Sequence, residues 1–136
     1  MKINRLLLTI FCGIILQSCI KKTDIIPPEA EISAIYNFTD TSASFEVIVT
    51  HQSNAQWDSF YEIWVDTSTI SINSFPPNNS YLSPLEKDTM QTTISGLKNS
   101  SHYFARVHYE GVFDIGGPNE RKRFLLGEEK EFTTLP

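Results

Sequence analysis

Three histidines and several carboxylates are the side chains with which this chain could perform acid/base or metal chemistry. His102 and His108 lie six positions apart on what reads as one strand, about 20 Å at roughly 3.3 Å per residue, so together they cannot hold one metal ion. We expect them and His51 to be solvated, and the acidic stretch Glu128–Glu131 to be a solvated edge. No serine-hydrolase elbow, His-Glu-x-x-His, phosphate loop or calcium loop is present. We therefore expect a protein that is not an enzyme and has no cofactor or metal site.

The other reactive side chains are two thiols, Cys12 and Cys19, near the start of the chain. Lys2 and Arg5 precede the apolar run Leu6–Leu16, which is too short for a bilayer core of about 30 Å that needs roughly twenty helical residues. A basic start, a short apolar run and a small residue before a cut are typical of a secretory signal. We interpret residues 1–18 as such a signal, with a buried core segment as the alternative.

The cut region reads Leu16-Gln17-Ser18-Cys19 and resembles the lipobox of bacterial lipoproteins. The resemblance implies cleavage before Cys19, a diacylglycerol on its sulfur and an acyl chain on its nitrogen. Each buried methylene contributes about 0.8 kcal/mol, so three chains would make attachment to a membrane effectively permanent. Ile20 follows, not the Asp that favours retention in the inner membrane. The resemblance therefore predicts the outer membrane, with the protein facing either the periplasm or the outside.

The rest of the chain has the size and charge of one folded domain. Without its first 18 residues the 136-residue chain keeps 118, enough to bury a core. The 11 basic residues fall to nine against 16 acidic ones, which argues against nucleic-acid binding. With Cys12 removed and Cys19 acylated, the domain has no disulfide. Pro27-Pro28 ends an extended tether over residues 19–28, and we expect one domain over residues 29–136.

The hydrophobic pattern of this domain predicts strands. Apolar and polar side chains alternate along Ala43–Val49 and Tyr61–Val65. Similar runs occur at Glu31–Phe38, Met90–Leu97, Tyr103–Tyr109 and Phe124–Thr134. No apolar period of 3.6 follows the signal, so an all-β sandwich of about seven antiparallel strands in two sheets is expected. Ser71–Lys87 and Gly111–Arg123, which ends in three basic residues, read as long connections.

The segment Gly96–Val107 resembles the fibronectin type III pattern G-L-x-P-x-T-x-Y-x-V-R-V, with Asn99 in place of the proline and Ser101 in place of the threonine. The resemblance implies that Leu97 plugs the core. It also implies that Tyr103 forms the tyrosine corner, with a buried ring and a hydroxyl bonded to backbone a few residues upstream.

Phe132–Thr134 resembles the final strand of the same family, and Phe60–Thr69 resembles its third strand as it occurs in Bacteroidota envelope proteins. Val47 stands where the family usually carries a core tryptophan, and Ser71–Lys87 is longer than usual. An immunoglobulin-like sandwich of another subtype is therefore an alternative.

One surface has the composition of a binding site. If Tyr61 and Tyr103 point inward, alternation turns Trp64, Phe104 and Arg106 outward. The family resemblance makes their two strands neighbours, which would bring these three side chains together. Exposed aromatic rings beside an arginine are typical of a binding hot spot and could stack on a sugar. Alternatively, Arg106 covers Trp64 by a cation-π contact, or the long insertion folds over both.

These observations predict a non-enzymatic, lipid-anchored binding, adhesion or spacer module of the cell envelope, with an envelope protein as its partner. The alternative is a carbohydrate-binding accessory lipoprotein of a polysaccharide-uptake system. A structural module without any partner is a third possibility. The fold alone does not choose among them.

Overall fold

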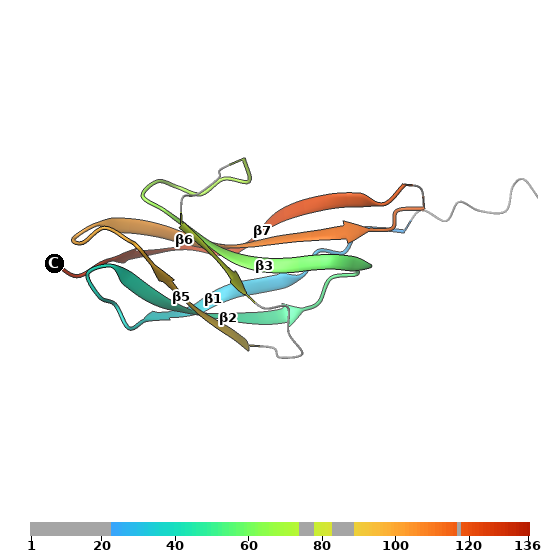
Figure 1. Ribbon diagram of the computed structural model, residues 1–136. Helices are drawn as coiled ribbons and strands as arrows, with labels where there is room; N and C mark the ends of the chain where they lie inside the picture. Colours follow the sequence, from blue (N-terminus) through green and yellow to red (C-terminus); the bar gives the residue numbers. More distant parts are fainter. Residues whose placement is uncertain (1–22, 74–77, 83–88, 117) are drawn as a thin grey trace, which may run out of the picture.

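A computed structural model describes residues 23–73, 78–82, 89–116 and 118–136 of the chain. This part is all-β, and it contains no helix that is long and apolar enough to cross a membrane. Its seven strands are β1 (Glu29–Tyr36), β2 (Ser42–His51), β3 (Trp57–Asp66), β4 (Asn78–Leu82), β5 (Thr89–Ser95), β6 (His102–Phe113) and β7 (Glu120–Thr133). They form two antiparallel sheets, in the orders β1-β2-β5 and β4-β3-β6-β7, packed face to face (Figure 1). The expected sandwich of about seven strands is confirmed.

The core lies between the two sheets and is filled by every second residue of the central strands. In β2 the alternation buries Phe45 and Val47, and in β3 it buries Ile63 and Val65. Val47 is completely shielded from solvent. Aromatic rings also fill the core, and Phe132 meets Phe45 edge to face at 5.5 Å.

Strand β4 falls within the stretch that we expected to be a long connection. It pairs with β3 from Tyr61 opposite Leu82 to Val65 opposite Asn78. The sequence gives little sign of it, because asparagines open the strand and asparagine is depleted in strands. Its partner matters for the subtype: in constant-type immunoglobulin domains the fourth strand pairs with the fifth, whereas here it pairs with the third.

The connection between β6 and β7 is shorter than expected. The two strands pair as far as Phe113 opposite Glu120, so only residues 114–119 join them. The basic residues Arg121–Arg123 therefore lie inside β7 and not in a loop. Sequence alternation missed this extension because glycine and charged side chains interrupt the apolar pattern near the turn.

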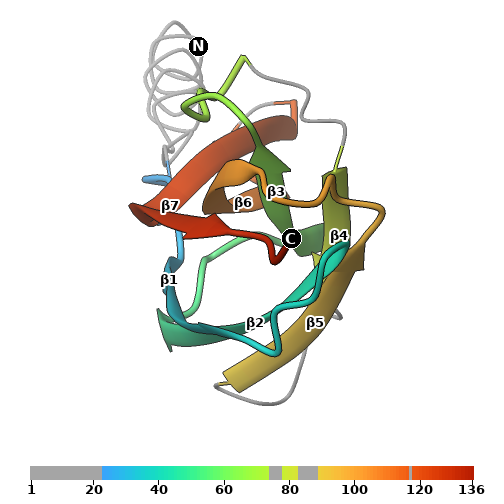
Figure 2. The same cartoon turned by 90° about the vertical axis from the view of Figure 1, so that its left-hand side faces the viewer.

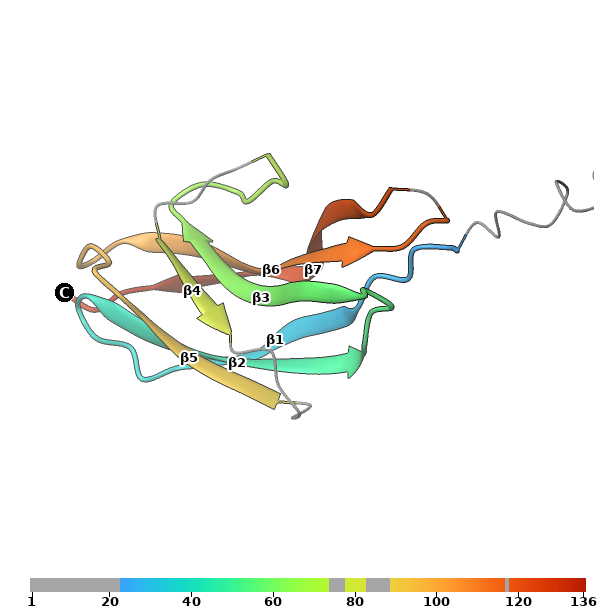
Figure 3. The same cartoon turned by 45° about the vertical axis from the view of Figure 1, so that its right-hand side comes forward.

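The sandwich has two distinct ends. The chain enters β1 at one end, which we call the tether end, where the β2–β3 and β6–β7 connections also lie (Figures 1 and 3). The C-terminus and the β1–β2 and β5–β6 turns lie at the other, which we call the far end. Figure 2 looks at the far end and shows the two sheets as separate layers.

Hydrogen bonds from Thr134 and Leu135 join the two turns of the far end. The amide of Leu135 donates to the carbonyl oxygen of Thr39 at 3.0 Å, and its own carbonyl accepts from the Ser100 amide at 2.9 Å. The buried Thr134 hydroxyl donates to the Lys98 carbonyl at 2.6 Å and accepts from the Ser101 amide at 3.0 Å. Both far-end turns are thereby held to one backbone segment.

Candidate functional site

The tyrosine corner forms as the sequence predicts. The ring of Tyr103 is buried, and its hydroxyl accepts a hydrogen bond from the Lys98 amide, five residues upstream, at 2.8 Å. Leu97 is buried next to it in the core. Both residues therefore contribute to the packing of the fold.

The three residues of the expected binding surface lie on neighbouring strands, but they do not form an exposed aromatic platform. Trp64 lies opposite Arg106, and Asp66 lies opposite Phe104, in the β3–β6 ladder. Trp64, however, is only 4% exposed, and Phe104 and Arg106 are half-buried. The expectation that Trp64 is available to a partner is therefore wrong.

Trp64 is buried by a cluster on the face of the four-stranded sheet that points away from the core. We call Glu62, Trp64, His108 and Arg123 the outer cluster. The Trp64 indole nitrogen donates to Glu62 Oε2 at 2.9 Å, and its ring stacks on His108 with centroids 4.0 Å apart and planes 12° apart. The Arg123 guanidinium carbon lies 5.4 Å from the Trp64 ring centroid. The cation-π partner of Trp64 is thus Arg123, not Arg106, whose Nε donates to the Gly127 carbonyl at 3.1 Å.

His108 is the most buried member of the outer cluster, at 2% exposed, which corrects the expectation of a solvated histidine. Its Nδ1 lies 3.0 Å from Glu62 Oε2, and its Nε2 lies 3.4 Å from Arg123 Nε, a donor. Both contacts are satisfied by a neutral imidazole with its proton on Nδ1, an assignment that follows from the network. Burial lowers the pKa of His108; Glu62 opposes this change and Arg123 adds to it.

The basic residues Arg121–Arg123 of β7 form ion pairs with carboxylates of the same sheet. Arg121 pairs with Glu110 at 2.7 Å, and Arg123 approaches the other oxygen of the same carboxylate at 3.9 Å. Lys122 pairs with Glu120. All three cations of this run are therefore paired with carboxylates of the same sheet.

The segment that follows β3 lies over the outer side of the same sheet (Figures 1 and 3). Ile70 in this segment is buried, and its amide donates to Glu129 Oε2 on β7 at 2.6 Å. This contact holds the residue before the expected insertion against β7. Most of the insertion at residues 71–87 lies outside the described residues.

The remaining histidines do not form a metal site. His102 lies at the far-end start of β6, where it pairs with Glu131 at 3.2 Å and meets Phe104 edge to face at 5.1 Å. His51 is exposed at the end of β2. Among the described residues, no group of three or more His, Cys, Asp or Glu side chains could hold a metal ion.

The described part of the expected tether is docked on the domain. The Asn54 side chain accepts from the Ile26 amide at 2.8 Å and donates to the Asp24 carbonyl at 2.8 Å. The Asn54 amide also donates to the Ile26 carbonyl at 3.2 Å, and Pro28 is fully buried. We call these contacts the Asn54 clamp. Residues 24–28 therefore belong structurally to the sandwich, although the prolines made them read as a spacer.

Neighbouring contacts fix the loop that carries Asn54. The hydroxyls of Ser53 and Tyr109 form a hydrogen bond, and Ser53 Oγ accepts from the Ala55 amide at 3.1 Å. Tyr61 lies beside Tyr109 with ring centroids 4.8 Å apart, and burial raises the pKa of Tyr61 above its usual value. The loop that carries the clamp is thus hydrogen-bonded to the buried Tyr109.

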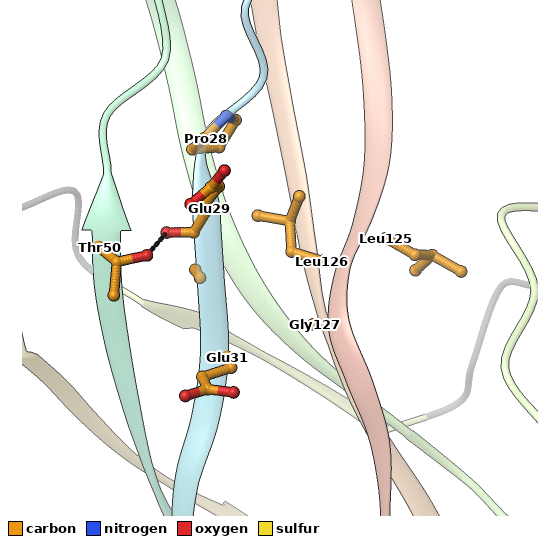
Figure 4. Close-up of a pocket in the computed structure, with 8 residues that line it drawn as sticks. Pro28, Glu29, Glu31, Thr50, Leu125, Leu126 and Gly127 are labelled. Atoms are coloured by element: carbon orange, nitrogen blue, oxygen red, sulfur yellow. Dashed lines mark hydrogen bonds between the residues drawn. The ribbon is translucent and has the colours of Figure 1, made fainter.

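A groove with a volume of about 470 Å³ lies between β1 and β7 (Figure 4). Pro28, Glu29 and Glu31 line one side, and Leu125 and Leu126 line the other. At its edge the two strands come so close that a Cβ on Gly127 would lie 2.9 Å from the carbonyl oxygen of Ala30. A glycine inside a strand pattern was the one sequence signal for this close approach.

The comparisons with known proteins add only a remote structural similarity. No family model matches the chain, and no curated protein matches it. Among solved structures, the sensor domain of the anti-sigma factor RsgI4 from Pseudobacteroides cellulosolvens is similar over 82% of this chain and 98% of that domain, at 19% identity and a TM-score of 0.47. A similarity of this degree carries no information on function.

Proposed function

We propose that this protein is a non-enzymatic module of the bacterial cell envelope, anchored by lipid on Cys19 in the outer membrane, that binds or spaces another envelope protein. The signal-like segment and the lipobox at residues 16–19 support the anchor. The observation that carries the proposal is the arrangement of the two ends. The chain enters the sandwich at the tether end, and the β1–β2 and β5–β6 turns, which are hydrogen-bonded to the C-terminal segment, lie at the far end. An anchored module with this arrangement presents its far end to a partner.

Three features support a sandwich of the fibronectin type III kind. Strand β4 pairs with β3, Tyr103 forms the corner with the Lys98 amide, and Leu97 fills the core beside it. Such domains commonly use the loops at the ends of the sandwich for binding. The far end suits this role because its turns are already ordered, which lowers the entropic cost of association.

A protein partner is favoured over a carbohydrate. The carbohydrate alternative depended on Trp64 as a stacking surface for a sugar. The Trp64 ring instead stacks on His108 and has the Arg123 guanidinium over it. At the far end, by contrast, Phe38 and Leu135 are 37% and 50% exposed. Exposed apolar side chains on a rigid surface are the usual anchors of a protein interface.

Mass spectrometry of the protein purified from its native membrane fraction tests the anchor. We expect a mature chain that begins at Cys19 and carries three acyl chains, and a Cys19→Ser variant that is released from the membrane. An unmodified Cys19, or a chain that keeps residues 1–18, contradicts the proposal.

Crosslinking in intact cells tests the partner. We expect one defined protein to be recovered with the anchored chain and lost with Phe38→Glu, while Arg106→Glu on the side of the sandwich keeps it. Recovery that depends on Arg106 and not on Phe38 would place the interface on the sheet. Binding to a defined polysaccharide on a glycan array would favour the carbohydrate alternative.

A further inference from the structure

We infer that the Asn54 clamp holds the sandwich upright on the membrane, with the tether end as its bilayer-facing surface and the far end as its outermost point. This inference rests on the proposed acylation of Cys19. The partner of the tether end is then the headgroup layer of the membrane in which the lipid is inserted.

The first step is the direction in which the chain leaves the domain. Asn54 makes three hydrogen bonds of 2.8 to 3.2 Å to this segment: it accepts from the Ile26 amide and donates to the carbonyl oxygens of Asp24 and Ile26. Pro28 is fully buried, and Ile25 packs against the core. Residues 24–28 are therefore held against the domain at the tether end, where the chain enters β1 (Figure 1).

The second step is the length of chain between the anchor and the clamp. Five residue steps separate Cys19 from Asp24, and a fully extended chain spans at most about 3.6 Å per residue, or about 18 Å. Strand β7 alone has 14 residues and spans about 46 Å at 3.3 Å per residue. The tether is much shorter than the sandwich, so the tether end stays within about 18 Å of the anchor and the far end cannot take its place at the membrane.

The third step is the chemistry of the sides and of the end. Exposed carboxylates lie along the β1–β7 side, at Glu31 and Glu128, and also near the tether end, at Asp24 and Glu29, so repulsion by an anionic leaflet does not choose between the two surfaces. Ile26, at the tether end, is 46% exposed. An apolar side chain fits the boundary between headgroups and acyl chains better than water. The exposed Ile26 and the short tether together favour standing on the tether end.

Fluorescence quenching in vesicles tests the orientation. The full acylated protein, with a dye on Asn119→Cys at the tether end or on Asn99→Cys at the far end, is placed in phosphatidylethanolamine and phosphatidylglycerol vesicles that contain a headgroup-linked quencher. We expect quenching several-fold stronger at Asn119 than at Asn99. In an Asn54→Ala background we expect this ratio to fall by at least half. Gln56→Ala, an exposed change in the same loop, should leave it unchanged.

Hydrogen exchange measured on the same variants in detergent tests the clamp without reference to the bilayer. We expect exchange of the Ile26 amide to be at least tenfold faster in Asn54→Ala, while the Lys98 amide at the far end keeps its rate and so reports an intact fold. Equal quenching at Asn119→Cys and Asn99→Cys in the acylated protein that keeps Asn54 overturns the proposed orientation. An unchanged Ile26 rate overturns the clamp. An unmodified Cys19 overturns the anchor, and the exchange measurement still decides the clamp.

Discussion

The two faces of the four-stranded sheet are both shielded from water but are built from different chemistry. Toward the core, β3 places Ile63 and Val65, which are completely buried. On the opposite face the same strand places Glu62 and Trp64, only 7% and 4% exposed, against His108 of β6. Alternation along a strand therefore tells which way a side chain points, but it does not tell whether that face of the sheet is exposed to solvent.

The two faces gain stability in different ways. The inner face gains it by removing apolar surface from water, which tolerates small changes of shape. The outer cluster depends on every polar group having a partner, and among the described residues no buried side-chain nitrogen or oxygen lacks one. Removing one member leaves the others desolvated and unpaired, so this face is sensitive to the loss of a single group.

The largest effect is expected for Ile63→Ala on the inner face. The substitution leaves a cavity at a fully buried position, so the free energy of unfolding should fall by about 2 to 5 kcal/mol. Ile48→Ala, the same change at a half-buried position of β2, should cost clearly less. Urea denaturation measures both, and equal losses would contradict the assignment of the inner face.

A smaller but still large effect is expected for Glu62→Ala. Both the Trp64 indole and His108 Nδ1 would lose their acceptor, which should reduce the free energy of unfolding by about 1 to 3 kcal/mol. Glu46→Ala is the matched control, because Glu46 also accepts two side-chain hydrogen bonds but lies in solvent. If both variants unfold at the same urea concentration, the outer cluster is not a stabilising unit.

Arg123→Met tests whether Arg123 covers Trp64. Loss of the cation-π contact should cost about 0.5 to 1 kcal/mol and make Trp64 more accessible to acrylamide. The measurement is made in a Trp57→Phe background so that Trp64 is the single fluorophore. Arg121→Met, which removes a neighbouring charge, should not change the quenching. A rise in quenching in Arg121→Met and not in Arg123→Met would show that Arg121, and not Arg123, covers Trp64.

The smallest effect is a pH dependence that separates the two faces. Burial lowers the pKa of His108 below its ordinary value of 6.5, so as the pH falls through that value the unfolded chain binds the proton first. Stability should therefore decrease below pH 6.5 until His108 is protonated in the folded protein. The His108→Gln variant should lose this component of the slope, and Ile63→Ala should keep it. An identical slope in His108→Gln would assign the acid sensitivity to other groups.

The sequence predicts those parts of the fold in which each residue's role depends on its own strand. Phe45 and Val47 follow from alternation, and the Tyr103 hydroxyl reaches its partner only five residues away. The outer cluster could not be predicted in the same way, because it requires the register of three strands. Glu62, His108 and Arg123 can be expected to contact one another only once β6 is known to lie between β3 and β7.

Two further outcomes depend on contacts that the local sequence does not encode. Strand β4 exists because β3 offers it an edge, not because of its own composition. Asn54 reads as an ordinary loop residue, and the prolines after Ile26 read as a spacer. Only the three-dimensional neighbourhood makes Asn54 the residue that fixes the entry of the chain.

The docked entry also determines how the module responds to a pull. Strand β1 begins directly after the clamp and pairs with β2 from Glu29 opposite His51 to Tyr36 opposite Ser44. Tension between the membrane and a protein held at the far end would run parallel to these strands. The cross-strand hydrogen bonds would then be sheared together instead of opening one after another, so an anchor at Cys19, as proposed, would load the fold in the direction in which it resists stretching.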